Sequence, residues 1–126
     1  MIKVGTYLNV CDNSGAKKVY CIKLLSSSKK IYSYVGDLIL VAVKKLRKKR
    51  KNTSKVQKGD LCKALIVRTK TNINTSSGNS HVYFDNSVVL LNKQNKLIGT
   101  RILSPLASKF RYTRFFKLIS LSLGLI

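Results

Sequence analysis

Three cysteines and one histidine are the residues of this chain that could support metal or redox chemistry. Cys11, Cys21 and Cys62 form no Cys-x-x-Cys pair, and His81 is distant in sequence from each of them. A zinc site with ordinary ligand spacing is therefore not predicted, and three thiols cannot all pair as disulfides. We expect buried free thiols and no metal site.

The acidic residues are equally poor candidates for catalysis. All four are aspartates, Asp12, Asp37, Asp60 and Asp85, and each lies next to Gly or Asn in turn-like sequence. No two of them are close enough in sequence to suggest an acid–base pair or a carboxylate cage for Mg²⁺ or Ca²⁺. The glycines form neither a GxGxxG motif nor a Walker loop, so no nucleotide cofactor is predicted either. The chain is not expected to be an enzyme.

Basic residues carry most of the functional information. The 126 residues include 25 Lys and Arg against 4 acids, a formal net charge of +21. Such a chain binds polyanions, of which nucleic acid and anionic membrane are the natural candidates. Its apolar runs, at 38–43, 64–67 and 88–91, fall short of the ~18 residues that a membrane span needs. The segment 106–120 makes a poor amphipathic helix, so we expect no membrane partner. With no signal or transit peptide recognised, we expect the protein to work in the compartment where it is made.

The densest basic run lies at 44–51, where seven of eight residues are Lys or Arg. It is either a solvated loop or localisation signal, or a phosphate-gripping extension that is mobile until it binds nucleic acid; we favour the second. Its place between two strand candidates makes it a loop on a rigid scaffold. In the C-terminal segment, basic residues alternate with aromatic ones at 110–116. These rings could stack on unpaired bases, but we favour their anchoring a short helix to the core.

The elements that would position these residues read as an all-β core. Residues 7–11 and 18–25 flank an Asp-Asn-Ser-Gly turn and resemble a hairpin, in which Gly15 supplies a positive φ. Two stretches repeat the order Gly-Asp, apolar strand, basic residues, beginning at Gly36 and Gly59. Their near-continuous apolarity predicts strands covered on both faces, as in a small closed barrel. Whether the two basic ends share one rim stays open. Past Pro105 the pattern predicts one or two helical turns. We expect a single domain over 1–126, made of a barrel at about 1–104 and a helical segment at about 105–120.

Six motifs in this order resemble the large-subunit ribosomal protein L-fourteen family: "YLNVCDNSGAKKVYCIKLL", "YVGDLILVAVKK", "KGDLCKALIVRTK", "FDNSVVLLN", "GTRILSP" and "FKLISL". The resemblance covers about residues 2–122. It implies a mainly β fold: a small five-stranded barrel with a protruding basic β-ribbon or loop and short C-terminal helices.

The same resemblance implies a structural role in the large ribosomal subunit. The implied partners are large-subunit rRNA, ribosomal proteins L-three and L-nineteen, and small-subunit rRNA at inter-subunit bridges. Thr100, Arg101 and Lys117 would face the subunit interface, where a ribosome-silencing factor docks in relatives. The resemblance and the charge pattern together make the following residues candidates for RNA binding: Lys17, Lys18, Lys29, Lys30, Lys44, Lys45, Arg47, Lys48, Lys49, Arg50, Lys51, Lys55, Arg68, Lys70, Lys109, Arg111 and Arg114. A free-standing OB-like module for single-stranded RNA is the alternative.

Two segments depart from the family pattern. The loop at 46–57 is longer than usual, lacks Pro and is packed with Lys and Arg, while 71–80 is more polar and less basic than its counterpart. The Lys-, Asn- and Ile-rich composition, without Glu or Trp, suggests an AT-rich organellar genome. It favours a mitochondrial ribosome, with a plastid or bacterial cytoplasm as alternatives.

Overall fold

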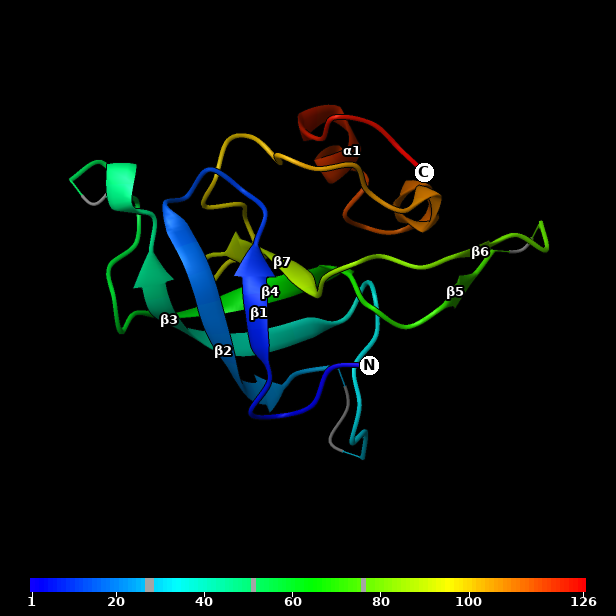
Figure 1. Cartoon of the computed structure of the whole chain (residues 1–126), viewed down its shortest axis with the longest axis horizontal. Helices are drawn as coiled ribbons and strands as arrows, with labels where there is room; N and C mark the ends of the chain where they lie inside the picture. Colours follow the sequence, from blue (N-terminus) through cyan, green and yellow to red (C-terminus); the bar gives the residue numbers. More distant parts are fainter. Residues whose placement is uncertain (27–28, 51, 76) are drawn as a thin grey trace.

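The structure is a computed structural model that describes residues 1–26, 29–50, 52–75 and 77–126. Five strands close into a barrel in the order β1-β2-β3-β4-β7 (Figure 1). Neighbouring strands run antiparallel, except that β1 and β7 pair in parallel. The barrel strands are β1 (Tyr7–Val10), β2 (Ala16–Leu24), β3 (Leu38–Leu46), β4 (Leu61–Arg68) and β7 (Ser87–Leu91). The predicted five-stranded barrel is confirmed.

The barrel interior is filled by aliphatic side chains from every strand, such as Leu8, Val19 and Val41. Residues 88–91 of β7 and 64–67 of β4 are all buried, as their unbroken apolar sequence predicts, and the polar Ser87 of β7 is buried as well. Strand β3 differs, because its residues alternate between buried and half-buried positions up to Val43. The C-terminal segment contributes Phe110 and Leu118 to the same buried cluster and lies on the β7 side of the barrel in Figure 1. Covering on both faces is therefore seen for β7 and for residues 64–67 of β4, and not for β3.

The C-terminal segment folds into a short 3-10 helix, η2 (Ser108–Tyr112), and one α-helical turn, α1 (Lys117–Leu121). Both are short, as expected past Pro105. Backbone hydrogen bonds tie the segment together: the Ile102 N–H donates to the Leu121 carbonyl at 2.9 Å, and the Leu106 N–H to that of Gly124 at 3.0 Å. The helical turns are thus held by packing and by tertiary hydrogen bonds, since helices this short are marginal alone.

Two excursions leave the barrel at opposite ends of the long axis in Figure 1. One is a two-stranded ribbon made of β5 (Ile73–Asn74) and β6 (Ser80–His81), whose residues other than Ile73 are polar. The other is the loop at 46–57, which contains the 3-10 turn η1 (Lys48–Arg50); the dense basic run begins in β3, at Lys44 and Lys45, and continues into this loop. The projecting ribbon and the basic loop are therefore separate features.

The two Gly-Asp sequences form the same turn. Gly36 and Gly59 have φ angles of +96° and +95°, a region that suits glycine. In each turn the Asp carboxylate accepts a hydrogen bond from the backbone N–H three residues earlier, at 3.0 Å for Asp37 and 2.8 Å for Asp60. The repeat noted in the sequence is thus one type of turn, used twice, that leads into β3 and into β4.

The turn at residues 12–15 connects β1 to β2 as predicted, and Gly15 has a φ of +101°. It also lies against the basic loop, because a Cβ added at Gly15 would overlap the Ser54 Cβ and lie 2.9 Å from the Ser54 Cα. Gly15 is required both for its backbone conformation and for this close approach.

We predict that Gly15→Ala destabilises the protein more than Gly59→Ala does. Both substitutions carry the strain of a positive φ, about 1–3 kcal/mol, but a Cβ at Gly59 meets nothing within 4 Å. Only the first must also displace the loop at Ser54, so it should lower the urea midpoint further and speed tryptic cleavage in 46–57. Equal midpoints and equal cleavage rates for the two variants would contradict the close approach.

Candidate nucleic-acid interface

The site is organised by Asp12, a carboxylate that is only 1% exposed. Its Oδ2 accepts a hydrogen bond from the Leu90 N–H at 2.9 Å, which ties the turn at 12–15 to β7. Its Oδ1 accepts from the Ser14 N–H at 3.0 Å and from the Ser14 hydroxyl. A buried carboxylate is tolerated when donors surround it, and here they also fix the conformation of the turn.

The next residue of the turn holds a second segment. The Asn13 side-chain oxygen accepts from the Thr100 N–H at 2.7 Å and the Arg101 N–H at 3.2 Å, and its amide donates to the Thr100 hydroxyl at 2.8 Å. Gly99 permits this approach, because a Cβ there would lie 2.8 Å from the Asn13 oxygen. Two of the three predicted interface residues, Thr100 and Arg101, are therefore positioned by the turn.

The last two residues of the turn hold the basic loop at both ends. The Gly15 carbonyl accepts from the Arg47 N–H and the Ser14 carbonyl from the Lys55 N–H, each at 2.9 Å. Two side chains add further ties: Arg47 donates to the Val10 carbonyl at 3.1 Å, and Lys55 to the Ile98 carbonyl at 3.2 Å. The loop was expected to be mobile before binding; instead its two ends have defined partners in the free chain. Lys51 and the side chain of Arg50 lie outside the described residues.

The strands that follow the two Gly-Asp turns, β3 and β4, each end in basic residues. A row of residues that lie opposite each other on neighbouring strands links these two basic ends. Lys45 of β3 pairs with Lys18 of β2, and Lys18 pairs with Asn9 of β1. Asn9 pairs with Ser87 of β7, which in turn pairs with Arg68 of β4. Where β3 and β4 pair directly, their basic ends lie at opposite ends of the pair, because the strands are antiparallel. The two ends meet instead around the other side of the barrel.

Two adjoining hollows follow this row. The first is lined by Lys17, Lys45, Lys48 and Lys49 together with Asn9. The second is lined by Lys18, Lys70, Tyr7 and Phe84, and it shares Asn9 with the first. We call the six exposed lysines of these hollows the basic face: Lys17, Lys18, Lys45, Lys48, Lys49 and Lys70.

Other predicted RNA-binding residues have different surroundings. Lys44 lies over the Tyr20 ring, with 5.5 Å from Nζ to the ring centroid. Arg68 forms an ion pair with Asp85 at 3.2 Å, donates to the Ser87 hydroxyl at 3.0 Å, and is only 18% exposed. Lys29 and Lys30 are exposed in the β2–β3 connection, at the rim opposite the basic loop. The structure thus does not gather all candidates on one surface.

The C-terminal candidates do not all line one hollow, because Lys109 borders a different one from Arg114 and Lys117. Lys109, Arg111, Arg114 and Lys117 are exposed, and so is Arg101. Arg114 and Lys117 line a groove with Lys96 and Asn95, whose floor includes Leu118. Among the aromatic residues here, Phe110 is buried and Phe115 half-buried, while Tyr112 and Phe116 are exposed. The predicted anchoring role therefore holds for the first two rings.

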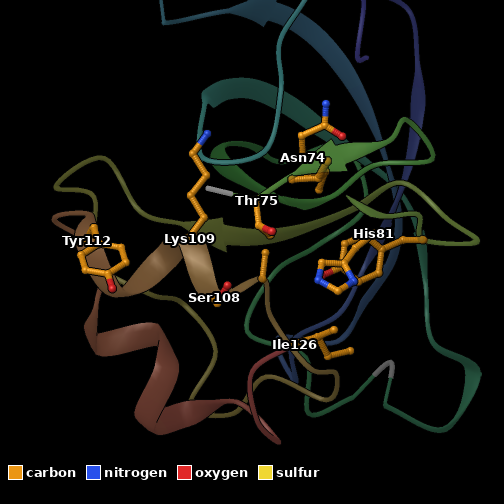
Figure 2. Close-up of a pocket in the computed structure, with 10 residues that line it drawn as sticks. Asn74, Thr75, His81, Ser108, Lys109, Tyr112 and Ile126 are labelled. Atoms are coloured by element: carbon orange, nitrogen blue, oxygen red, sulfur yellow. The ribbon is translucent and has the colours of Figure 1, made fainter. Parts of the chain in front are cut away.

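A pocket of about 280 Å³ lies between the β5–β6 ribbon and the C-terminal segment (Figure 2). Lys109 and Tyr112 border it on one side, and His81 and Ile126 on another. Tyr83 also lines it, with a buried hydroxyl that has no hydrogen-bond partner among the described residues. Burial raises the pKa of this phenol. Ser108 and His81 both line the pocket, but no hydrogen bond joins their side chains among the described residues, so we assign it no chemistry.

The three thiols are free, with Cys11 and Cys21 buried and Cys62 half-buried. Burial raises the pKa of the Cys11 thiol to about 11, and likewise that of Cys62 to about 11. Thiolates are thereby disfavoured, so these side chains are suited to packing and not to reactivity. Within the described ranges no three His, Cys, Asp or Glu side chains are grouped as metal ligands would be. None of the helices in this part of the chain is both long and apolar enough to cross a membrane.

Comparison with known protein families matches the chain over residues 1–126 to the model described as ribosomal protein L14p/L23e. The chain belongs to this family. The predicted resemblance is confirmed over the whole length, beyond the 2–122 that the motifs cover. As an L14p/L23e protein it is a structural component of the large ribosomal subunit, and it resides on the ribosome.

Some surface residues of this L14p/L23e protein were not among the predicted site residues. Asn9 joins the two hollows of the basic face, Phe84 and Tyr7 line the second, and Lys96 lies in the C-terminal groove. The alternation of "YLNV" places Tyr7 and Asn9 on the outer face of a half-buried strand and could have indicated them. Phe84 follows no such pattern, because it lies in an irregular stretch between β6 and β7.

We predict that Asp12→Asn lowers the free energy of unfolding by about 1–3 kcal/mol, the usual cost of a buried donor without an acceptor. An amide has one oxygen, so either the Leu90 N–H or the Ser14 donors would face an NH₂ group. Asp60→Asn is the matched control, because Asp60 is exposed and accepts one backbone bond that an amide oxygen can keep. Urea denaturation should show a much smaller shift for the control; equal shifts would contradict the role given to Asp12.

We also predict that alkaline pH weakens the fold partly through its thiols. The folded state keeps the Cys11 and Cys62 thiols protonated, so their contribution to stability is complete below the ordinary thiol pKa of about 8.5 and is lost as pH rises toward 11. Lysines also titrate in this range, so the informative comparison is with Cys11→Ala. The variant should lose less stability than the wild type between pH 9 and 11. Parallel curves would contradict the predicted shift.

Proposed function

We propose that this L14p/L23e protein binds large-subunit rRNA through the basic face. The observation that carries the proposal is the continuous row from Lys45 through Lys18 and Asn9 toward Arg68, which joins two lysine-lined hollows. An RNA strand carries its phosphates in a line, so lysines arranged in a line along the protein surface can contact several of them at once.

The basic face favours recognition of backbone and shape. Its lysines are exposed, carry no acceptors and present mobile point charges, which contact phosphates without reading base edges. Double-stranded RNA offers its bases poorly to side chains, so shape and phosphate contacts are the usual mode. The protein would hold packed rRNA by neutralising it at a fixed position.

The surface around Thr100, Arg101 and Lys117 is the proposed contact with the small subunit. Asn13 holds the backbone of the first two residues against the turn, so this surface and the basic face are positioned by neighbouring residues. The proposed partners here are small-subunit rRNA at inter-subunit bridges and a ribosome-silencing factor. Ribosomal proteins L-three and L-nineteen are the proposed neighbours within the large subunit.

A free-standing OB-like RNA-binding module is the second candidate. The observation in its favour is that Tyr7 and Tyr20 lie together on the barrel surface, with ring centroids 5.1 Å apart. Co-sedimentation separates the two: a chain that stays with large subunits in high salt supports the ribosomal role, and a chain found free supports the module. For the source of the ribosome we propose a mitochondrion, on composition alone.

We predict a strong salt dependence of binding to a large-subunit rRNA transcript. If roughly eight phosphates are engaged, log K should fall with log[salt] with a slope of about −6 to −7. A slope near zero would contradict the electrostatic account.

The matched comparison is Lys48→Ala/Lys49→Ala against Lys23→Ala/Lys93→Ala, because both pairs remove the same charge from exposed positions and only the first belongs to the basic face. The first pair should weaken binding to many RNA sequences alike and reduce the slope by about 1.5. Equal losses in the two double variants would mean that net charge, and not the basic face, determines binding.

A further inference from the structure

Phe84 is 99% exposed, the highest value among the exposed large apolar side chains of the described chain. A single exposed apolar residue needs no explanation, but a second exposed aromatic side chain lines the same hollow as this ring. Tyr7, itself 60% exposed, lines the same hollow of about 300 Å³ and contacts Tyr20 edge to face. The hollow therefore presents flat aromatic surface to solvent.

The backbone beside Phe84 is firmly held. The Asp85 carboxylate accepts from Arg68 at 3.2 Å, from the Ser87 hydroxyl at 2.7 Å and from the Asn9 amide at 3.4 Å. Asn86 accepts from the Lys70 N–H at 2.8 Å, and its carbonyl accepts from the Asn9 N–H at 3.0 Å. Figure 1 shows this stretch returning from the ribbon to enter β7 beside β1. The backbone next to the ring is therefore held before any ligand arrives, and a ligand has to order only the exposed Phe84 side chain itself.

The charge around the ring selects the ligand. Lys18 and Lys70 line the hollow, and Asn9 connects it to the hollow that contains Lys17 and Lys45. Asn9 and Asp85 also supply acceptors, since Oδ1 of each has no donor among the described residues. A ligand that fits has a planar ring with hydrogen-bond donors at its edge and carries phosphate on either side. An acidic peptide lacks the ring, and a membrane surface lacks the donor edge.

We propose that this hollow holds one unpaired nucleotide of large-subunit rRNA, with its base stacked on Phe84 and its flanking phosphates at Lys18 and Lys70. The inference rests on the proposed function, which it deepens by adding a base contact to a surface otherwise described by phosphate contacts. Base–aromatic stacking tolerates any base, so the site would select for an unstacked nucleotide and not for a sequence.

The experiment uses the full chain and two probes of matched charge, a short oligoadenylate and a blunt RNA duplex. Phe84→Ala should weaken binding of the oligoadenylate about 5- to 100-fold, the range for loss of one stacked base, and change duplex binding by less than about twofold. Phe84→Tyr should restore single-strand binding. Because Phe84 is fully exposed, the alanine variant should keep the wild-type urea midpoint.

Tyr112→Ala is the matched control, an aromatic residue that is 91% exposed but borders the pocket of Figure 2. It should leave both affinities unchanged. Several results would overturn the inference: an unaffected Phe84→Ala, an equal loss with the duplex, or a loss with Tyr112→Ala alone. Normal RNA binding by Phe84→Ala with failed incorporation into subunits would make the ring a protein anchor and also overturn it. A wild-type chain that binds neither probe would contradict the proposed function itself.

Discussion

The buried Asp12 carboxylate is the interaction on which the remaining site geometry depends. It joins the end of β1 to β7 through Leu90 and sets the turn through Ser14. Because that turn is fixed, Asn13 can hold residues 100–101 while the Ser14 and Gly15 carbonyls hold the two ends of the basic loop. One desolvated charge thereby determines where the basic loop, the barrel surface and the proposed subunit interface lie relative to one another. Loss of this carboxylate would disturb all three together.

A net charge of +21 on 126 residues opposes folding through self-repulsion. The few acids offset part of this repulsion and also stabilise local structure. Asp37 and Asp60 accept backbone hydrogen bonds in the turns before β3 and β4, and Asp85 forms an ion pair with Arg68. The remaining repulsion falls mostly on exposed lysines, where water screens it. A polyanion that binds only the folded chain adds its binding free energy to the stability of the fold. The excess charge that weakens the free protein therefore stabilises the assembled one.

Local features of the sequence predicted much of this fold. The Asp-Asn-Ser-Gly turn, the repeated Gly-Asp entries and the short apolar runs have causes within a few residues, and the structure has them where expected. The row across the barrel could not be predicted in this way, because it depends on the registers of four strand pairs, including the parallel pairing of β1 and β7. The anchoring of the basic loop was missed for a similar reason: its hydrogen-bond partners in the turn lie about thirty to forty residues earlier in the chain. Charge density alone suggested mobility, whereas tertiary hydrogen bonds to uncharged carbonyls decide the path of the loop ends.

The two kinds of basic residue have different tasks near this surface. Arg47 and Arg68 turn inward, where one binds the Val10 carbonyl and the other binds Asp85 and Ser87. A guanidinium has several donors in one plane, so it satisfies fixed acceptors well, whereas an ammonium on a flexible stem adapts to acceptors whose positions vary. The six residues of the basic face are all lysines, and they are exposed. The arginines thus stabilise the scaffold and the lysines remain free to follow the RNA backbone. On such an adaptable surface, any preference for a particular RNA structure has to come from the barrel shape and from the aromatic rings that its backbone presents.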